Sequence, residues 1–137
     1  MAKSNYLDFS QLEKAIEGLE EAIEGDVLDQ FMRDFLVEMA YRIHARTIKR
    51  TPVHSGELRR NWQVGKVERV GEGYVVELFN NTDYASFVEF GHRTGDNLTE
   101  WNEGKFMMTM SIEEVQKELP RYFDQRVQKL FDKLMKG

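Results

Sequence analysis

The sequence predicts a single α+β domain, in which a small antiparallel sheet of about three or four strands packs against two long helices. Apolar residues recur at helical spacing up to about residue 50 and again after residue 111. Between these segments, short apolar runs alternate with polar residues and are separated by glycine-containing turns. We therefore expect the element order α-α-β-β-β-α over residues 1–137.

The first expected helix begins at Ser10–Glu13, which has the capping-box pattern, and ends at about residue 25. One side of this helix is apolar, and the other side is acidic. The apolar side consists of Leu12, Ile16, Leu19 and Ile23, and the acidic side of Glu13, Glu17, Glu20, Glu21 and Glu24. This segment is predicted to be an amphipathic helix that precedes the core of the domain, residues 26–137.

The second expected helix is the longest before the sheet and supplies the centre of the core. Gly25 is expected to cap the first helix, and Asp26 to begin the second. The second helix then runs to about Arg50, because Pro52 disfavours helical geometry at Thr51. Its apolar face is formed by Leu28, Phe31, Phe35, Met39 and Ile43.

A β-hairpin is expected after residue 61. A strand from Trp62 to Val70, with an irregularity at Gly65, is followed by a turn at Gly71–Gly73 and a return strand from Tyr74 to Phe79. The next run, residues 84–91, fits a third strand and also a short helical turn, and periodicity does not separate the two.

The rest of the chain is predicted to be a loop and a helix. Residues 92–105 are polar and longer than a usual connection, so a mobile or partner-ordered loop is expected there. A capping-box pattern at Ser111–Glu114 predicts the start of the C-terminal helix, with a kink at Pro120. The apolar stripe beyond the kink consists of Phe123, Val127, Leu130 and Leu134.

The formal net charge is −5, but the charges are unevenly distributed. Residues 1–30 carry eight acidic and two basic side chains, whereas residues 42–60 carry six basic side chains against one acidic one. The basic set is Arg42, Arg46, Lys49, Arg50, Arg59 and Arg60. Two interpretations stay open: favourable interaction with a helix dipole, or a surface for an acidic partner. In the second interpretation, the acidic partner is the N-terminal segment of a neighbouring copy of the chain. Its candidate residues are Glu13, Glu17, Glu20 and Glu24.

No arrangement of residues indicates catalysis, a metal or a cofactor. The chain has no Cys, and its histidines, His44, His54 and His92, lack the spacing of a helical metal site. His54 precedes Ser55, but the glycine-flanked elbow that presents a serine nucleophile is missing. Glu89 lies in an apolar run, where pairing with an arginine is favoured over catalysis. We expect a non-enzymatic protein without cofactor or metal, and no run is apolar enough to span a membrane.

Two segments carry a more specific signal. Thr51-Pro52-Val53-His54-Ser55-Gly56-Glu57-Leu58-Arg59 resembles the "thr-pro-val-asp-thr-gly-x-leu-arg" signature of the gene-ten-like minor tail or neck proteins of tailed phages and prophages. Tyr84-Ala85-Ser86-Phe87-Val88-Glu89-Phe90-Gly91 resembles the family's "tyr-ala-x-tyr-val-glu-phe-gly" signature. The matching positions are Thr51, Pro52, Ser55, Gly56, Leu58, Arg59, Tyr84, Ala85, Val88, Glu89, Phe90 and Gly91.

The resemblance extends over roughly residues 26–135 and has three departures. His54 replaces the usual Asp, and Ser55 replaces the usual Thr. The family's "pro-phe-leu-x-pro-ala" segment before the last helix is missing, and residues 101–108 occupy its place.

The resemblance implies a structural virion protein at the head–tail junction, as a neck, tail-completion or tail-terminator component. It implies a ring of copies, hexameric by expectation, that contacts adjacent neck, tail-tube or head-completion proteins. DNA would pass through this ring without specific recognition, and assembly would take place in the host bacterial cytoplasm. The alternative is a nucleic-acid-associated adaptor that uses the basic 42–60 segment, although a sequence pI near 5.3 argues against general DNA binding.

Overall fold

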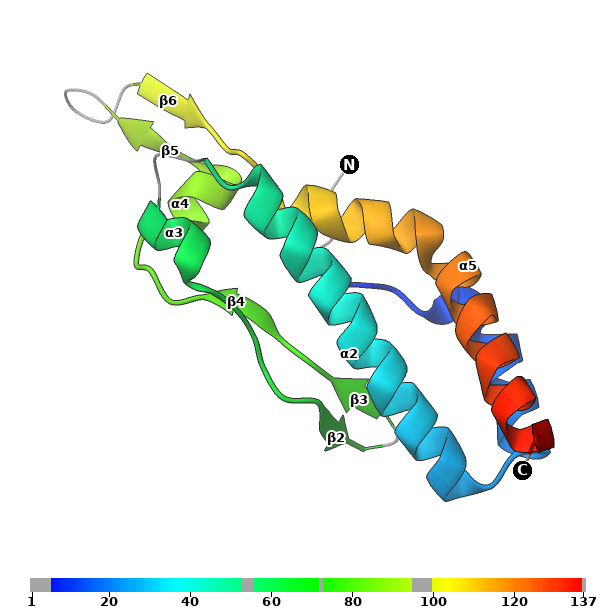
Figure 1. Ribbon diagram of the computed structural model, residues 1–137. Helices are drawn as coiled ribbons and strands as arrows, with labels where there is room; N and C mark the ends of the chain where they lie inside the picture. Colours follow the sequence, from blue (N-terminus) through cyan, green and yellow to red (C-terminus); the bar gives the residue numbers. More distant parts are fainter. Residues whose placement is uncertain (1–5, 53–55, 72, 95–99, 137) are drawn as a thin grey trace.

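Helix α2 (Gly25–Arg50) runs along the molecule, and the other long helix, α5 (Met107–Lys136), packs against it (Figure 1). The computed structural model describes residues 6–52, 56–71, 73–94 and 100–136. Strand β1 (Trp62–Val64) also contacts α2, so the central helix supports both a helical layer and antiparallel strands. The predicted α+β class, with two long helices and small antiparallel sheets, is confirmed.

The core lies between α2 and α5. The predicted face of α2 supplies Phe31, Phe35, Met39 and Ile43, all of them buried. Helix α5 supplies Phe123, whose ring meets that of Phe35 edge-on at a centroid distance of 5.4 Å. Each fully buried side chain of this size contributes about 1.5–3 kcal/mol through removal of apolar surface from water. This aromatic cluster therefore sets the spacing between the two long helices.

The N-terminal segment packs against both long helices: the ring of Phe9 meets that of Phe35 on α2, and the backbone N–H of Asp8 donates to the side chain of Gln116 on α5. A short 3₁₀ turn, η1 (Ser10–Leu12), leads into α1 (Glu13–Ala22), and Leu12 and Leu19 are buried in the core. The expected capping box at Ser10 does not form, because the carboxylate of Asp8 accepts the backbone N–H of Ser10 instead. The amphipathic first helix is confirmed, with its regular α-helical part beginning at Glu13.

The predicted hairpin is present but consists of two short ladders. Strand β1 pairs with β4 (Leu78–Asn80), and β2 (Glu68–Val70) pairs with β3 (Gly73–Val75), both antiparallel. The ladder is interrupted near Gly65, as expected, although the N–H of Gly65 still donates to the carbonyl of Glu77 at 2.8 Å. Gly71 has φ +61°, a backbone conformation that glycine adopts at little cost, and it forms the turn.

A hydrogen-bonded cluster fastens the far end of this hairpin to α2. The hydroxyl of Tyr74 donates to Asp29 at 2.5 Å, and Arg69 donates to the same carboxylate oxygen at 3.1 Å. These bonds, together with a bond from Arg33, lower the pKa of Asp29. The hairpin therefore lies along α2 with both of its ends held.

Residues 84–91 resolve the alternative that periodicity left open. They form the helix α4 (Ala85–Phe90), followed directly by strand β5 (Gly91–Thr94), so the third strand of the expected order is wrong at this position. The helical spacing brings Ala85 and Val88 onto one side, where both pack against the cluster formed by Leu58, Trp62 and Met107. Packing thus decides between two locally acceptable conformations.

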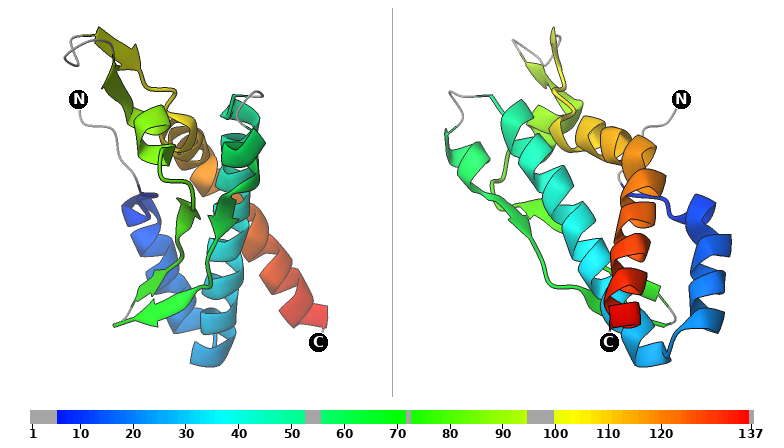
Figure 2. Two further views of the ribbon diagram at one scale, coloured as in Figure 1. Left: turned by 90° about the vertical axis from the view of Figure 1, so that its left-hand side faces the viewer. Right: turned by 45° about the vertical axis from the view of Figure 1, so that its right-hand side comes forward.

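The expected mobile loop at residues 92–105 contains regular structure. Strand β5 pairs antiparallel with β6 (Glu100–Glu103), with Gly91 opposite Glu103, and the connecting residues 95–99 lie outside the described residues. Figures 1 and 2 show this second hairpin projecting beyond the helices. The expected single sheet is thus replaced, among the described residues, by three separate two-stranded ladders.

The ends of the helices also differ in part from expectation. Helix α2 ends at Arg50 as predicted, and Thr51 is extended. Gly25 is the first residue of α2 and has no positive φ, so it does not cap α1. Helix α5 begins at Met107, four residues before the expected capping box at Ser111. It continues through Pro120 and changes direction midway in Figure 1, consistent with the backbone hydrogen bond that proline removes.

Candidate functional site

The two signature segments meet at the start of α5. The first signature includes helix α3 (Gly56–Arg60), and the second forms α4. Leu58 and Met107 are fully buried together with Trp62, and Tyr84, Ala85 and Val88 pack around them. Three segments that are far apart in sequence, residues 58–62, residues 84–88 and the start of α5, therefore share one small apolar cluster.

Thr51 connects the end of α2 to this cluster. Its hydroxyl donates to the carbonyl of Thr47 at 2.7 Å and accepts the indole N–H of Trp62 at 2.9 Å. The carbonyl of Leu58 accepts a hydrogen bond from the side chain of Asn80 at 2.8 Å, which joins α3 to the hairpin. Thr51 and Leu58 of the first signature thus act as structural residues, and His54 and Ser55 lie outside the described residues.

Glu89 of the second signature caps helix α5. Its side chain is 3% exposed, and its two oxygens accept the backbone N–H groups of Met108 at 3.0 Å and Thr109 at 2.8 Å. The hydroxyl of Thr109 donates to the same carboxylate at 2.7 Å. A carboxylate at this position satisfies two free N–H groups and interacts favourably with the helix dipole. The expected arginine partner is therefore wrong: Glu89 is paired with a helix N-terminus.

Two glycines allow the backbone to pass close to this cap. Gly91 has φ +91°, which strongly disfavours any side chain. A Cβ atom on Gly104 would lie 2.5 Å from the carbonyl oxygen of Glu89 and 2.8 Å from the nitrogen of Gly91. The N–H of Phe106 donates to that same carbonyl at 2.9 Å. The second hairpin therefore leaves the body of the molecule through a tightly packed glycine crossing.

Half of the basic set is neutralised inside the molecule by α5 and α2. Arg46 makes a two-pronged contact with Glu118, at 2.5 and 3.1 Å, and Arg50 contacts Glu114 at 2.5 Å. Arg42 pairs with Glu38 on its own helix, and its guanidinium lies 3.9 Å from the ring centroid of Tyr122. Those pairs and the ring contact hold α2 and α5 together in antiparallel orientation. Arg42, Arg46 and Arg50 therefore do not form a free basic surface.

The ion pairs shift the titration of the α5 glutamates. Hydrogen bonds from Arg46 and from the hydroxyl of Tyr122 hold the pKa of Glu118 at about 2, below its usual 4.5. The pKa of Glu114 is also lowered, chiefly by its hydrogen bond from Arg50. Both carboxylates are therefore more stable as anions in the folded protein than in the unfolded chain.

The remaining predicted interface residues lie on opposite sides of the molecule. Lys49 and Arg60 are exposed and Arg59 is half-buried, at the end of α2 and on α3. The four predicted acidic residues, three on α1 and one between α1 and α2, are exposed, and none makes an ion pair within the described parts of the chain. These four are Glu13, Glu17, Glu20 and Glu24. Figures 1 and 2 show α1 and α3 on opposite sides of α2.

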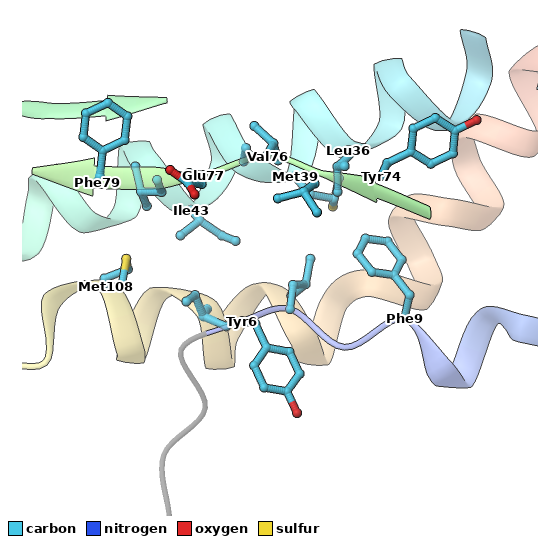
Figure 3. A pocket seen from close by; sticks show the side chains of 15 residues that line it. Tyr6, Phe9, Leu36, Met39, Ile43, Tyr74, Val76, Glu77, Phe79 and Met108 are labelled. Carbon is cyan, nitrogen blue, oxygen red and sulfur yellow. The ribbon is translucent and has the colours of Figure 1, made fainter. Parts of the chain in front are cut away.

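An apolar groove of about 540 Å³ separates the β3–β4 strand from α5 and the N-terminal segment (Figure 3). Met39 and Ile43 of α2 and Met108 of α5 line it, and Glu77 supplies the one carboxylate in its described lining.

The described residues also show no metal site. The ring nitrogen Nε2 of His44 lies 3.0 Å from the carbonyl oxygen of Trp62. Nowhere in the described ranges do three or more metal-ligating side chains gather, and no described helix is long and apolar enough to span a bilayer.

The fold and these contacts define an α+β scaffold whose signature residues hold helices and strands in place. A family model described as "Bacteriophage HK97-gp10, putative tail-component" matches residues 13–91. This match covers more than half of the chain, so the chain belongs to the HK97-gp10-like family of phage tail components, and it is virion-associated. The matched range contains both signatures and also α1, which carries no recognisable signature of its own. Neither the curated proteins nor the solved structures contain a significant match.

Proposed function

We propose that this protein is a non-enzymatic structural component that forms a ring at the head–tail junction of a tailed phage or prophage particle. It acts there as a neck, tail-completion or tail-terminator protein and contacts adjacent neck, tail-tube or head-completion proteins. Its membership of a tail-component family supports this role. The signature residues support it as well, because Glu89 and Thr51 serve to build a rigid scaffold.

The observation that carries the proposal is the separation of charge between two sides of the molecule. Closed rings are built from heterologous contacts, in which one face of a subunit meets a different face of the next. The acidic face of α1 and the basic end formed by Lys49, Arg59 and Arg60 are two such faces. Opposite charges steer the encounter of the two faces and disfavour contacts between like faces. Six copies arranged in this way would enclose a channel for DNA, with no base-specific contact.

The interface is tested by reversing exposed charges. The variant Lys49→Glu/Arg60→Glu should fold normally but fail to join heads to tails in a complementation assay, because it would place carboxylates opposite α1. Arg46 is unsuitable for this test, since a carboxylate at this position would face Glu118 and disturb the contact between α2 and α5. The matched control, Lys66→Glu/Lys117→Glu, alters the net charge equally at two other exposed lysines and should complement fully. Full complementation by both variants would remove the charge-matched interface.

The position in the particle is tested by electron microscopy of particles produced without this gene. Separate heads and tails, or tails of uncontrolled length, are the expected result. Particles that are joined and of normal length would contradict the proposed location.

The alternative of a nucleic-acid-associated adaptor loses much of its basis in the structure. Arg42, Arg46 and Arg50 contact carboxylates, which leaves Lys49, Arg59 and Arg60 of the original six for phosphate contacts. Since counterion release scales with the number of phosphates neutralised, three cations on an acidic protein predict weak, salt-sensitive binding. Tight DNA retention at physiological salt would favour the adaptor over the structural ring component.

A further inference from the structure

A second groove, of about 600 Å³, lies between the first turns of α2 and the last turns of α5. Its floor is apolar and consists of Val27 and Phe31 of α2 with Leu130 and Leu134 of α5. Leu134 is 44% exposed, so this floor is open to solvent. The groove is distant in sequence from both signatures and is not used by the proposed ring contact.

The two walls of this groove carry opposite charges. The wall formed by α2 is acidic, with Asp26, Asp34 and Glu38, and the wall formed by α5 is basic, with Arg126, Lys129 and Lys133. One end is closed by the ion pair between Glu38 and Arg126, in which an arginine nitrogen donates to a carboxylate oxygen at 2.8 Å. Toward the open end, the remaining acidic and basic side chains make no ion pair with any described residue.

The two oppositely charged walls are complementary to those of a second copy of the chain. If a second copy is turned by 180° about an axis parallel to the groove, the acidic wall of each copy faces the basic wall of the other. The same rotation brings the two apolar floors together. A two-fold axis across the groove would instead oppose like charges, which is unfavourable. An anionic polymer or lipid surface would likewise meet the acidic wall of α2.

We propose that the groove between α2 and α5 is a two-fold interface with a second copy of this chain. Asp26 and Asp34 of one copy contact Lys129 and Lys133 of the other, on both sides of the axis. The contact is isologous, so it differs from the head-to-tail contact of the ring and does not depend on it. It assigns a self-association surface to the free protein.

The test uses two charge variants with opposite defects. In the acidic variant, Lys129→Glu/Lys133→Glu, both walls are negative; in the basic variant, Asp26→Lys/Asp34→Lys, both walls are positive. Sedimentation of the parent protein at low salt should show a dimer that weakens as salt is raised. Each variant alone should dimerise about tenfold or more weakly, because like charges face each other. An equimolar mixture should restore a one-to-one heterodimer.

Controls separate this contact from the ring and from misfolding. Lys49→Glu/Arg60→Glu should keep the dimer, since both residues lie outside the groove. Should a double variant unfold, the single changes Lys129→Glu and Asp34→Lys provide a complementary pair at one level of the groove. A parent protein that stays monomeric at low salt, or a mixture that fails to form the heterodimer, would overturn the proposal. In either case, the ring would still be judged by its own complementation assay.

Discussion

Replacing Glu89 by glutamine tests whether the second signature acts by capping α5. The carboxylate accepts three hydrogen bonds, from the N–H of Met108, the N–H of Thr109 and the hydroxyl of Thr109. Glutamine has nearly the same shape but only one acceptor oxygen. Whichever way the amide is turned, its NH₂ group faces a donor of α5 where an acceptor is needed.

The cost of this substitution follows from the geometry. A donor left without a partner in a buried site costs about 1–3 kcal/mol. The lost interaction between the negative charge and the helix dipole adds about 0.3–1 kcal/mol, or more in a partly buried site. We therefore expect Glu89→Gln to lower the free energy of unfolding by about 2–3 kcal/mol. For a chain of this length, that corresponds to a fall in Tm of roughly 7–10 °C.

Urea denaturation followed by far-UV circular dichroism measures this loss. Glu113→Gln is the matched control, because Glu113 is an exposed glutamate on the same helix and makes no side-chain hydrogen bond within the described residues. The control should lie within about 0.5 kcal/mol of the parent. If Glu89→Gln also lies within that range, the capping argument is wrong, and the start of α5 must be held by its apolar contacts instead.

Three further predictions concern the contacts that hold the scaffold together. Because the pKa of Glu118 is about 2 when folded and about 4.5 when free, the unfolded chain takes up this proton first as the pH falls. Stability should therefore decline between about pH 5 and pH 2, and Arg46→Met should flatten that decline in acid unfolding curves. Gly104→Ala should destabilise the fold by about 2 kcal/mol or more, since its Cβ would meet backbone atoms, whereas Gly18→Ala on α1 has open space and should stabilise it by about 0.5–1 kcal/mol in thermal melts. Thr51→Val should cost about 1–3 kcal/mol in urea denaturation, because a buried indole N–H loses its acceptor; no loss would show that this bond is dispensable.

Local patterns in the sequence were enough to predict much of the scaffold. The apolar face of α2 repeats at helical spacing, and Pro52 ends that helix through its effect on the preceding residue. Gly71 marks the hairpin turn because few other residues adopt its positive φ. Each of these residues determines the conformation of its immediate neighbours, so its effect can be predicted without knowledge of the fold. The signatures likewise indicated the family to which the chain belongs.

Contacts between distant segments decided the rest. Residues 84–90 are acceptable as strand or helix in isolation, and packing on Leu58 and Trp62 selects the helix. Helix α5 starts at Met107 rather than at its local capping box, because Glu89, twenty residues before Thr109, caps it there. Arg46 and Glu118 are 72 residues apart, so only the antiparallel packing of α2 and α5 turns a basic stretch into an internal ion pair. Sequence patterns report conformations that neighbouring residues favour, whereas the partner of a charge or a helix end is chosen by the tertiary structure.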